Sequence, residues 1–389
     1  MHSASAPSSR AAPLRVALLL DTRVWAGTES YVLSLARALQ ALAADKSERD
    51  VKVMIATPRD SVLWKRARAA HIAALPIGRR GEWDPTTALV LARRLKRREL
   101  DIIHVHNGRT ALWGALAVKM ARRGACIATQ HFIEPAHAGK TGPKGRLQNA
   151  VHRSVESGIA HHVAISRAVA SAFLERSHLE PTLVTVVHNG IEVPTDAPDT
   201  RDLPPELCAD VACVARLEQE KDIPTLIRAL KILNARRDES QRVRGVIAGE
   251  GEQHGALTAL VQEENAGEFV LLAGWTPRAA AILKMAKVAV LPSVAEPFGL
   301  ALLEAMAQSK PVVAVNAGGP PEIVVEGETG SLVPPRDPGA LADALECLID
   351  NPGRAAQMGE AGLKRLRSCF TSERMARETL AVYQKVADK

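Results

Sequence analysis

Apolar residues in this chain gather in short β-branched runs, and stretches with a helical period of apolar and polar positions separate most of them. The runs are six in each half of the chain and lie at 14–20, 51–56, 101–105, 126–129, 162–165, 183–187, 210–214, 244–248, 269–273, 287–291, 311–315 and 331–333. Continuous Val, Ile, Leu and Ala runs are typical of strands buried on both faces, as in a parallel sheet. The pattern therefore predicts repeated βαβ units.

The intervening amphipathic segments predict the crossover helices of these units. They include 30–42, 85–98, 111–123, 224–235 and 339–348. Six strands per half predict an α/β chain of two doubly wound, Rossmann-like domains. We expect the boundary after the turn at 188–190, in the Pro- and Asp-rich stretch 194–205. Ligands bind at the carboxyl ends of such strands, so we expect an active site in a cleft between two facing domains.

Length and composition are those of a globular protein with two domains. The chain has 389 residues, of which 47% are hydrophobic. Residues 1–13 are small and polar and are expected to form a disordered tail without a secretion signal. The apolar runs are far shorter than the ~20 residues of a membrane-spanning helix. Five scattered cysteines without a C-x-x-C pair favour reduced thiols in the cytoplasm, with no zinc site.

Charge divides the chain into a basic first half and an acidic second half, with a net charge of +7. The basic clusters lie at Lys65–Arg68, Arg79-Arg80, Arg93–Arg98 and Arg122-Arg123, and at Lys140, Lys144 and Arg146. Such runs are either solvated helix faces or a surface attracted to anionic lipid headgroups. The segment 108–124, with Leu112, Trp113, Leu116, Val118 and Met120, is either a core-facing helix or an interfacial one. No nucleic-acid-binding motif accompanies the charge, and aromatic residues are only 3%.

Two cations follow the first strand of the second half. Arg216 and Lys221 lie five residues apart in a strand-to-helix loop. Both side chains can converge on one anion beyond the strand, where a helix N-terminus adds partial positive charge. Chance pairing of loop cations remains the alternative.

A glycine-rich turn follows the next strand. Gly249, Gly251 and Gly255 nearly match the dinucleotide fingerprint G-x-G-x-x-G, but the third glycine is one residue late. The turn also follows the second strand of its half instead of the first. We therefore interpret it as a close-approach turn near a nucleotide and disfavour an NAD dehydrogenase. Ordinary βα turn chemistry remains open.

The strongest motif is a strand-to-helix segment with two glutamates. Glu296 precedes Pro297, which favours a helix start just beyond it, and Glu304 lies about two turns further on. The amides at 298–300 would then be unpaired first-turn donors. Two carboxylates up to ~12 Å apart along the axis suit two separate polyols, a sugar and a ribose, with a diphosphate on the amides between them. A helix-entry Glu and a surface Glu are the plain alternative.

These motifs resemble, in order, those of the retaining GT-B glycosyltransferases of the glycosyl transferases group 1 clan. The Glu-x7-Glu element corresponds to Glu296 and Glu304, the Arg…Lys pair to Arg216 and Lys221, with Asp222 where the clan usually has Gly. Further matches are Gly249–Glu252, 317–323, Ala26–Glu29 with Ala in place of the first Gly, 101–106 and 187–191. The resemblance spans about residues 14–370.

The resemblance implies an acceptor-side domain at 14–190, a nucleotide-sugar domain at 191–370 and a C-terminal helix, 371–389, that returns to the first domain. It implies catalytic roles for Glu296, His131, Arg216 and Lys221. It implies donor contacts from Gly27, Gly249, Gly251, Phe298, Gly299, Leu300 and Glu304. The remaining histidines of the first half (His104, His106, His161, His162 and His188) are expected to pack or cap.

The expected activity is a retaining, metal-independent hexosyl transfer from a UDP- or GDP-sugar, without a cofactor. Two cations and helix amides can stabilise a departing diphosphate, and no Asp-x-Asp is present to hold a metal. The expected acceptor is a lipid-linked or bacterial envelope glycan, such as lipopolysaccharide, with the basic domain peripheral at the inner face of the membrane. A nucleotide-sugar epimerase and a catalytically degenerate binding homologue remain alternatives.

Overall fold

The computed structural model describes residues 12–44, 50–78, 84–133, 154–177 and 179–388. Its contacts divide the chain into two compact units. Unit 1 comprises Met1–Ala164, Phe173–Val187 and Ser372–Lys389, and unit 2 comprises Ile165–Ala172 and His188–Thr371. The basic clusters at 79–80 and 140–146 lie outside the described residues.

Unit 1 contains a seven-stranded sheet in which every neighbouring pair is parallel, in the order β3-β2-β1-β4-β5-β6-β7. The strands are β1 (Leu14–Leu19), β2 (Val51–Thr57), β3 (Ala73–Pro76), β4 (Ile102–Val105), β5 (Ala125–Gln130), β6 (His161–Ala164) and β7 (Val184–Val186). The order reverses between β1 and β4. At such a switch point the loops after the two strands diverge and leave room for a ligand.

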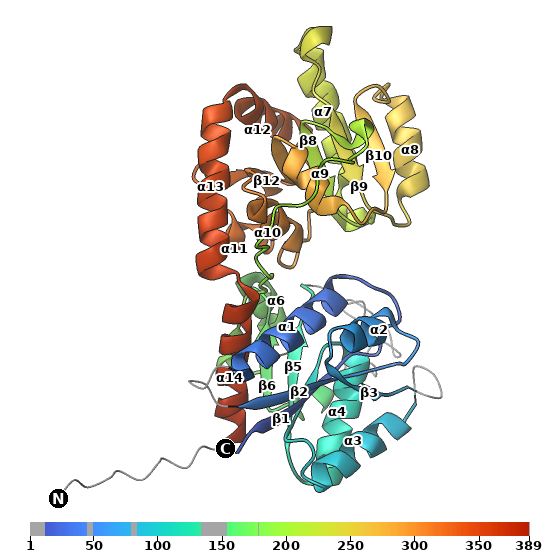
Figure 1. The fold of residues 1–389 in the computed structure, drawn as a ribbon, viewed down its shortest axis with the longest axis vertical. Coiled ribbons are helices and arrows are strands. Elements are labelled where there is room, and N and C mark those ends of the chain that lie inside the picture. Colours follow the sequence, from blue (N-terminus) through green and yellow to red (C-terminus); the bar gives the residue numbers. More distant parts are fainter. Residues whose placement is uncertain (1–11, 45–49, 79–83, 134–153, 178, 389) are drawn as a thin grey trace, which may run out of the picture. The chain divides into compact units, whose positions relative to one another are not determined.

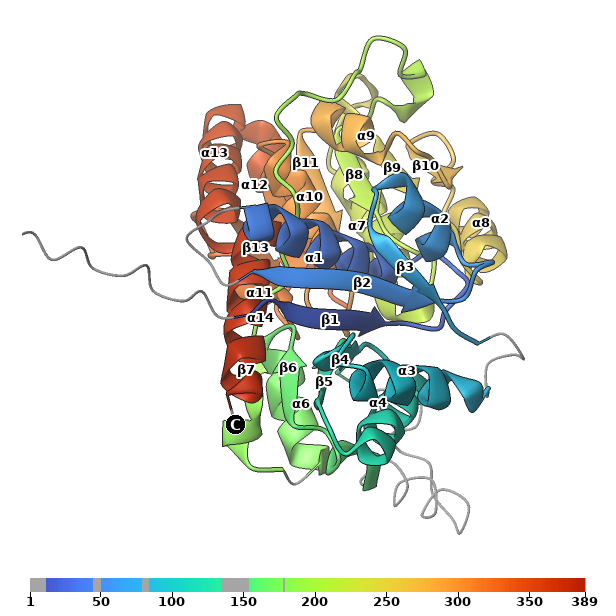
Figure 2. The same ribbon diagram turned by 60° about the horizontal axis from the view of Figure 1, so that its bottom comes forward.

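Helices cover both faces of this sheet. They are α1 (Gly27–Ala44), α2 (Val62–Ala69), α3 (Thr86–Lys96), α4 (Gly108–Ala121) and α14 (Ser372–Ala387). The helix α6 (Arg167–Ser177) is divided between the two units after Ala172. The helices α1 and α2 lie on one face, and α3 and α4 lie on the other (Figure 2). The C-terminal helix α14 packs beside α1, so the end of the chain completes the first unit (Figure 1).

Strand alternation divides the core of unit 1. Leu19, Ile103 and Val105 pack against α3 and α4, in a cluster that includes Leu91 and Trp113. Because successive strand residues point to opposite faces, the residues between them, His104 among them, face α1 and α14. A buried histidine therefore stands in the sheet where the pattern would otherwise place an aliphatic residue.

Unit 2 repeats the plan with six parallel strands in the order β10-β9-β8-β11-β12-β13. The strands are β8 (Val211–Val214), β9 (Gly245–Ala248), β10 (Val270–Gly274), β11 (Val288–Leu291), β12 (Val312–Val315) and β13 (Gly330–Val333). The helices are α7 (Ile223–Ala235), α8 (His254–Glu263), α9 (Ala279–Met285), α10 (Leu300–Ala307), α11 (Pro320–Ile323), α12 (Pro338–Asp350) and α13 (Pro352–Cys369). Its switch point lies between β8 and β11.

The core of unit 2 forms where α7 and α12 pack side by side over the sheet. Leu226, Leu230 and Leu233 of α7 contact the same cluster as Leu341 and Leu345 of α12. On the same unit, α10 packs against α9 and α13. This framework fixes the loops that leave β8 and β11.

The predicted α/β architecture is confirmed, with one correction to the strand count. All twelve predicted runs form strands within a few residues, but unit 1 has a seventh strand, β3. It was missed because it is a four-residue edge strand with partly exposed positions, which lacks the continuous apolar signal of buried strands. Among the residues described, no helix combines the length and apolar character needed to cross a bilayer.

Candidate functional site

The chemistry-bearing residues of unit 2 lie at its switch point. The loop after β8 carries Arg216 and Lys221, and the segment after β11 carries Glu296. The amide of Val294 donates to the carbonyl of Glu220 (3.0 Å), which ties the two loops together. The fold therefore brings residues 75 positions apart onto one edge of the sheet.

Lys221 and Glu296 form an ion pair at the centre of this edge. The Lys221 Nζ to Glu296 Oε2 distance is 2.6 Å, and the side chains are only 13% and 11% exposed. The pair is largely screened from water, so its charges interact strongly. Of the two predicted cations, Lys221 is the one that the structure places beside the first glutamate of the Glu-x7-Glu motif.

Arg216 lies differently from the expectation that both cations converge on one anion. Its side chain is 55% exposed, and the guanidinium contacts Glu220 (3.1 Å) and Glu218 (3.7 Å). Exposed pairs of this kind contribute little to stability and break readily. Lys221 and Arg216 are therefore each paired with a carboxylate of their own.

The turn after Glu296 is held by its carbonyls. The Glu296 carbonyl accepts from the amide of Gly319 (2.9 Å), and the Pro297 carbonyl accepts from Ser166 Oγ (2.7 Å). The Phe298 ring is buried and stacks on His188 at 5.8 Å. These contacts fix the backbone that enters α10.

Three amides at the start of α10 are left for a ligand. Within the described residues, no backbone hydrogen bond is donated by the amides of Phe298, Gly299 or Leu300. Gly299 has a φ of 115°, a conformation that glycine adopts without strain. Amides at a helix N-terminus are donors for anionic groups such as phosphates.

Glu304 lies in α10, and its side chain is open to solvent. The surrounding protein nevertheless raises the pKa of its carboxyl to about 7 through desolvation. Water that reaches the exposed carboxylate stabilises its charge and opposes this rise. The group is then available to accept hydrogen bonds from a polyol.

The glycines after β9 have a structural cause that the sequence does not reveal. A Cβ on Gly249 would lie 1.9 Å from the carbonyl oxygen of Ala215, and one on Gly251 would lie 2.4 Å from that of Leu217. The loop that carries Arg216 thus passes directly over both glycines. This packing alone requires glycine there; a close approach of these glycines to a nucleotide stays a prediction.

Asp222 explains its own departure from the family pattern. It is the N-cap of α7 and has a left-handed backbone, with a φ of 47°. Glycine adopts this conformation freely, and Asp is among the few other residues that tolerate it. The Asp222 carboxylate also accepts from Thr225 Oγ1 (2.7 Å). The turn is therefore preserved with a different residue.

Gly27 begins α1 at the carboxyl edge of the unit 1 sheet. A Cβ there would meet nothing within 4 Å, so the fold itself does not require glycine. The preceding amide, Ala26 N, donates to Glu29 Oε2 (2.8 Å), and Thr22 Oγ1 donates to the other oxygen of Glu29. The proximity of Gly27 to a ligand stays a prediction.

His131 follows β5 and belongs to a buried cluster. Its Nε2 lies 3.2 Å from Nδ1 of His106, which follows β4. The ring of Tyr31 packs edge-on against both imidazoles, at 4.9 and 5.6 Å between centroids. Burial lowers the pKa of His131 to about 3, so the imidazole is neutral at pH 7.

His104 extends the cluster toward the C-terminal helix. Its Nδ1 is 2.7 Å from the hydroxyl of Tyr383 in α14, and its Nε2 is 2.7 Å from Thr129 Oγ1. Burial lowers the pKa of His104 to about 3, and that of His106 falls well below its usual value.

A second polar cluster at the unit 1 switch point was not anticipated. Asp21, just after β1, accepts from Asn107 Nδ2 (2.7 Å) and pairs with Arg109 Nε (2.8 Å). Asp21 is 5% exposed.

The sequence does contain one signal for the histidine cluster. Residues two positions apart at a strand end lie on the same face of the sheet, as His104 and His106 do, and Thr129 and His131.

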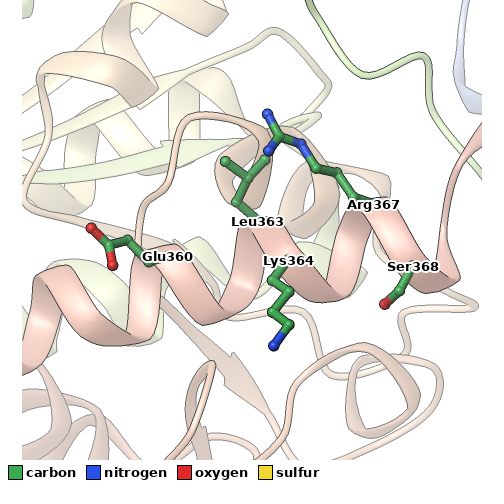
Figure 3. A pocket seen from close by; sticks show the side chains of 5 residues that line it. All are labelled: Glu360, Leu363, Lys364, Arg367 and Ser368. Carbon is green, nitrogen blue, oxygen red and sulfur yellow. The ribbon is translucent and has the colours of Figure 1, made fainter.

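Two hollows mark the described surface of unit 2. One, of about 400 Å³, adjoins the Lys221 loop and is lined by Glu218, Gln219, Asp222, Ile223, Pro224, Gln253, Leu257, Val294 and Arg336. The other is lined only by α13 residues, namely Glu360, Leu363, Lys364, Arg367 and Ser368 (Figure 3). Only the first shares a loop with the candidate site.

Two family models match separate parts of the chain. Residues 205–365 match the family model "Glycosyl transferases group 1", and residues 25–193 match "Glycosyltransferase Family 4". Glycogen synthase of Mycobacterium tuberculosis is 34% identical over 73% of this chain and 68% of its own. Alpha-maltose-1-phosphate synthase of Mycolicibacterium smegmatis is 30% identical over 74% of this chain and 79% of its own.

Solved structures agree on the fold. The crystal structure of Anabaena Alr3699/HepE in complex with UDP-glucose superposes with a TM-score of 0.79, at 21% identity, and covers 96% of this chain and 100% of its own. Two parallel-sheet domains, the ordered motifs and these family matches lead to one conclusion: the chain is a GT-B glycosyltransferase that belongs to the glycosyl transferases group 1, family 4 type.

Proposed function

We propose that this enzyme transfers a hexosyl group from a UDP- or GDP-sugar to an acceptor with retention of configuration and without a metal ion. The observation that carries the donor part is the Lys221–Glu296 pair at 2.6 Å beside three undonated amides. A diphosphate can exchange for the Glu296 carboxylate on Lys221 while its oxygens accept from the amides. Glu296 is then free to accept from the sugar hydroxyls, and Glu304 from the ribose.

The proposed chemical step needs no protein nucleophile. The bond from the anomeric carbon to the diphosphate oxygen breaks, and the acceptor oxygen bonds to the same face of that carbon. The acceptor hydroxyl gives its proton to the departing phosphate oxygen. Lys221 and the α10 amides stabilise the charge that grows on the leaving group, with Arg216 able to leave Glu220 and join them. His131 faces the transferred sugar in this proposal.

A nucleotide-sugar donor is supported by the structural neighbours, since Alr3699/HepE was solved with UDP and with UDP-glucose. The donor is identified by thermal shift against UDP-, GDP- and ADP-sugars. A donor at about 100 times its Kd stabilises the folded state by about 2.7 kcal/mol. The matching nucleotide-sugar should raise the Tm, and no shift with any of them would refute the donor proposal.

The catalytic proposal is tested with matched lysine variants. Lys221→Ala should lower turnover at least a hundredfold, whereas Lys231→Ala, which removes an exposed lysine paired with Glu264, should not. Equal activity of both variants would contradict the role of Lys221. Release of an epimerised nucleotide-sugar without acceptor would indicate an epimerase, and binding without turnover or hydrolysis would indicate a degenerate homologue.

For the acceptor, we propose a lipid-linked or envelope glycan reached from the membrane surface. Leu89 of α3 and Leu116 and Met120 of α4 are exposed at 42%, 36% and 38%, close to Lys119 and Arg122 in the sequence. Trp113, which the sequence left as a candidate for the interface, is buried against the sheet instead. Apolar side chains flanked by cations suit anionic lipid headgroups. More of the protein should sediment with vesicles that contain anionic lipid than with vesicles that lack it. The Leu116→Glu variant should show no such difference.

A second acceptor class is favoured by the relatives. Their names specify a glycogen synthase, an alpha-maltose-1-phosphate synthase and, at 29% identity, a D-inositol 3-phosphate glycosyltransferase. A glucan or a small phosphorylated acceptor is therefore the alternative. Turnover with a maltooligosaccharide, a sugar phosphate or inositol phosphate, and none with lipid-linked acceptors, would select it.

A further inference from the structure

The contact between His106 and His131 in unit 1 links two imidazoles of unequal access. His106 Nδ1 faces His131 Nε2 at 3.2 Å, and His106 Nε2 is fully enclosed without a hydrogen-bond partner. His131 Nδ1 also has no hydrogen-bond partner among the described residues. Unlike His106 Nε2, however, it is not fully buried. It is therefore the nitrogen of the pair that is left for a ligand.

Both rings carry one proton each. Burial keeps the two imidazoles neutral, because charging either would place an uncompensated cation inside the unit. The contact between them is then a single N–H···N hydrogen bond. Only two arrangements are possible, since either His106 donates from Nδ1 or His131 donates from Nε2.

The enclosed nitrogen of His106 distinguishes the two arrangements. If His131 donated, the proton of His106 would sit on Nε2, as a buried N–H without an acceptor. If His106 donates, its Nε2 is a bare lone pair, which is better tolerated than an orphaned donor. The second arrangement places the proton of His131 on Nδ1.

We propose that His106 is a positioning residue that holds His131 in the Nδ1–H tautomer, so that His131 donates a hydrogen bond to a substrate oxygen. The hydrogen bond on one imidazole nitrogen sets which tautomer the other presents. This inference rests on the proposed function only for the identity of the oxygen as one of the transferred sugar.

The surroundings keep the His106 ring in the required orientation. Tyr31 packs against it at 5.6 Å, and His104 lies at 4.4 Å between centroids. His104 is itself fixed by Tyr383 and Thr129, both at 2.7 Å. The C-terminal helix α14 thus supports the tautomer through Tyr383, which contacts His104, which in turn contacts His106.

The first test is the tautomer itself, read from the ¹⁵N and ¹H shifts of the imidazoles in the full chain, with His131→Gln used to assign the signals. We expect wild-type His131 to be the Nδ1–H form. His106→Leu should shift it to Nε2–H, whereas His106→Asn, whose amide can donate from the position of Nδ1, should keep Nδ1–H. His161→Leu removes a buried histidine elsewhere in the sheet and should leave the His131 signals unchanged.

Kinetics then connect the tautomer to turnover. His106→Leu should lower kcat/KM for the donor about tenfold, the effect of one lost substrate hydrogen bond, and His106→Asn should recover most of it. An Nε2–H form in the wild type, or an unchanged tautomer in His106→Leu, would overturn the inference. Absence of nucleotide-sugar turnover in the wild type would instead refute the proposed function, and the spectra would still decide the tautomer.

Discussion

Acid should destabilise unit 1 because burial keeps its histidines neutral. The pKa values of His104 and His131 are lowered to about 3, and that of His162 to about 4, from an ordinary value near 6.5. A histidine with a lowered folded pKa contributes stability above its unfolded pKa. That contribution is lost as the pH falls from about 6.5 toward the folded value.

The magnitude follows from linkage. Between pH 7 and pH 5 the unfolded chain takes up about 0.7 of a proton at each of these histidines, whereas the folded unit takes up almost none. Each histidine therefore lowers the free energy of unfolding by about 2 kcal/mol as the pH falls from 7 to 5. Three such groups approach the whole stability of a typical domain, about 5–15 kcal/mol.

Tryptophan fluorescence can follow unit 1 separately. Among the described residues, Trp25, Trp64 and Trp113 lie in unit 1, and Trp275 lies in unit 2. In a Trp275→Phe background, the free energy of unfolding measured in urea should be about 4–6 kcal/mol lower at pH 5 than at pH 7. His104→Gln, which can keep a hydrogen bond but cannot titrate, should reduce the difference by about 2 kcal/mol. A difference below about 1 kcal/mol in the parent would show that the cluster is hydrated or already charged.

Four further outcomes follow from the site. Gly249→Ala should lower stability by several kcal/mol in urea unfolding, because its Cβ meets a carbonyl oxygen at 1.9 Å, whereas Gly255→Ala, in open space within a helix, should add about 0.5–1 kcal/mol. Asp222→Ala should destabilise by about 1 kcal/mol, and Asp222→Gly by less, since the left-handed turn suits glycine. Gly27→Ala should leave the Tm unchanged and weaken donor binding in calorimetry; unchanged binding would place the donor elsewhere. Glu296→Gln should bind the free nucleoside diphosphate at least as tightly as the wild type while turnover falls at least tenfold.

The sequence was sufficient for the sheets and for the motif order because both depend on local patterns. Continuous apolar runs predict buried parallel strands, and the strand-end rule places Lys221 and Glu296 on one edge. The edge strand β3 carries no such run, since its residues are only partly buried. A continuous apolar run therefore does not identify β3.

Other features depend on contacts between distant segments, which no local pattern contains. Gly249 and Gly251 need to be glycines because the Arg216 loop crosses them, a fact set by tertiary packing. His106 was assigned to packing because a histidine beside a strand is usually structural. Its partner His131 lies 25 residues away, just after the neighbouring strand β5.

The Lys221–Glu296 pair gives the proposed donor site a consequence that can be tested separately from stability. A largely buried lysine without a partner would be costly, and Glu296 supplies its countercharge. In the proposed binding mode the donor displaces this carboxylate, which opposes binding but releases Glu296 to contact the sugar. Removing the charge at position 296 removes the carboxylate that competes with the diphosphate for Lys221. It also weakens the contact of residue 296 with the sugar. Nucleoside diphosphate affinity and turnover should consequently move in opposite directions, whereas loss of a purely structural ion pair would lower both.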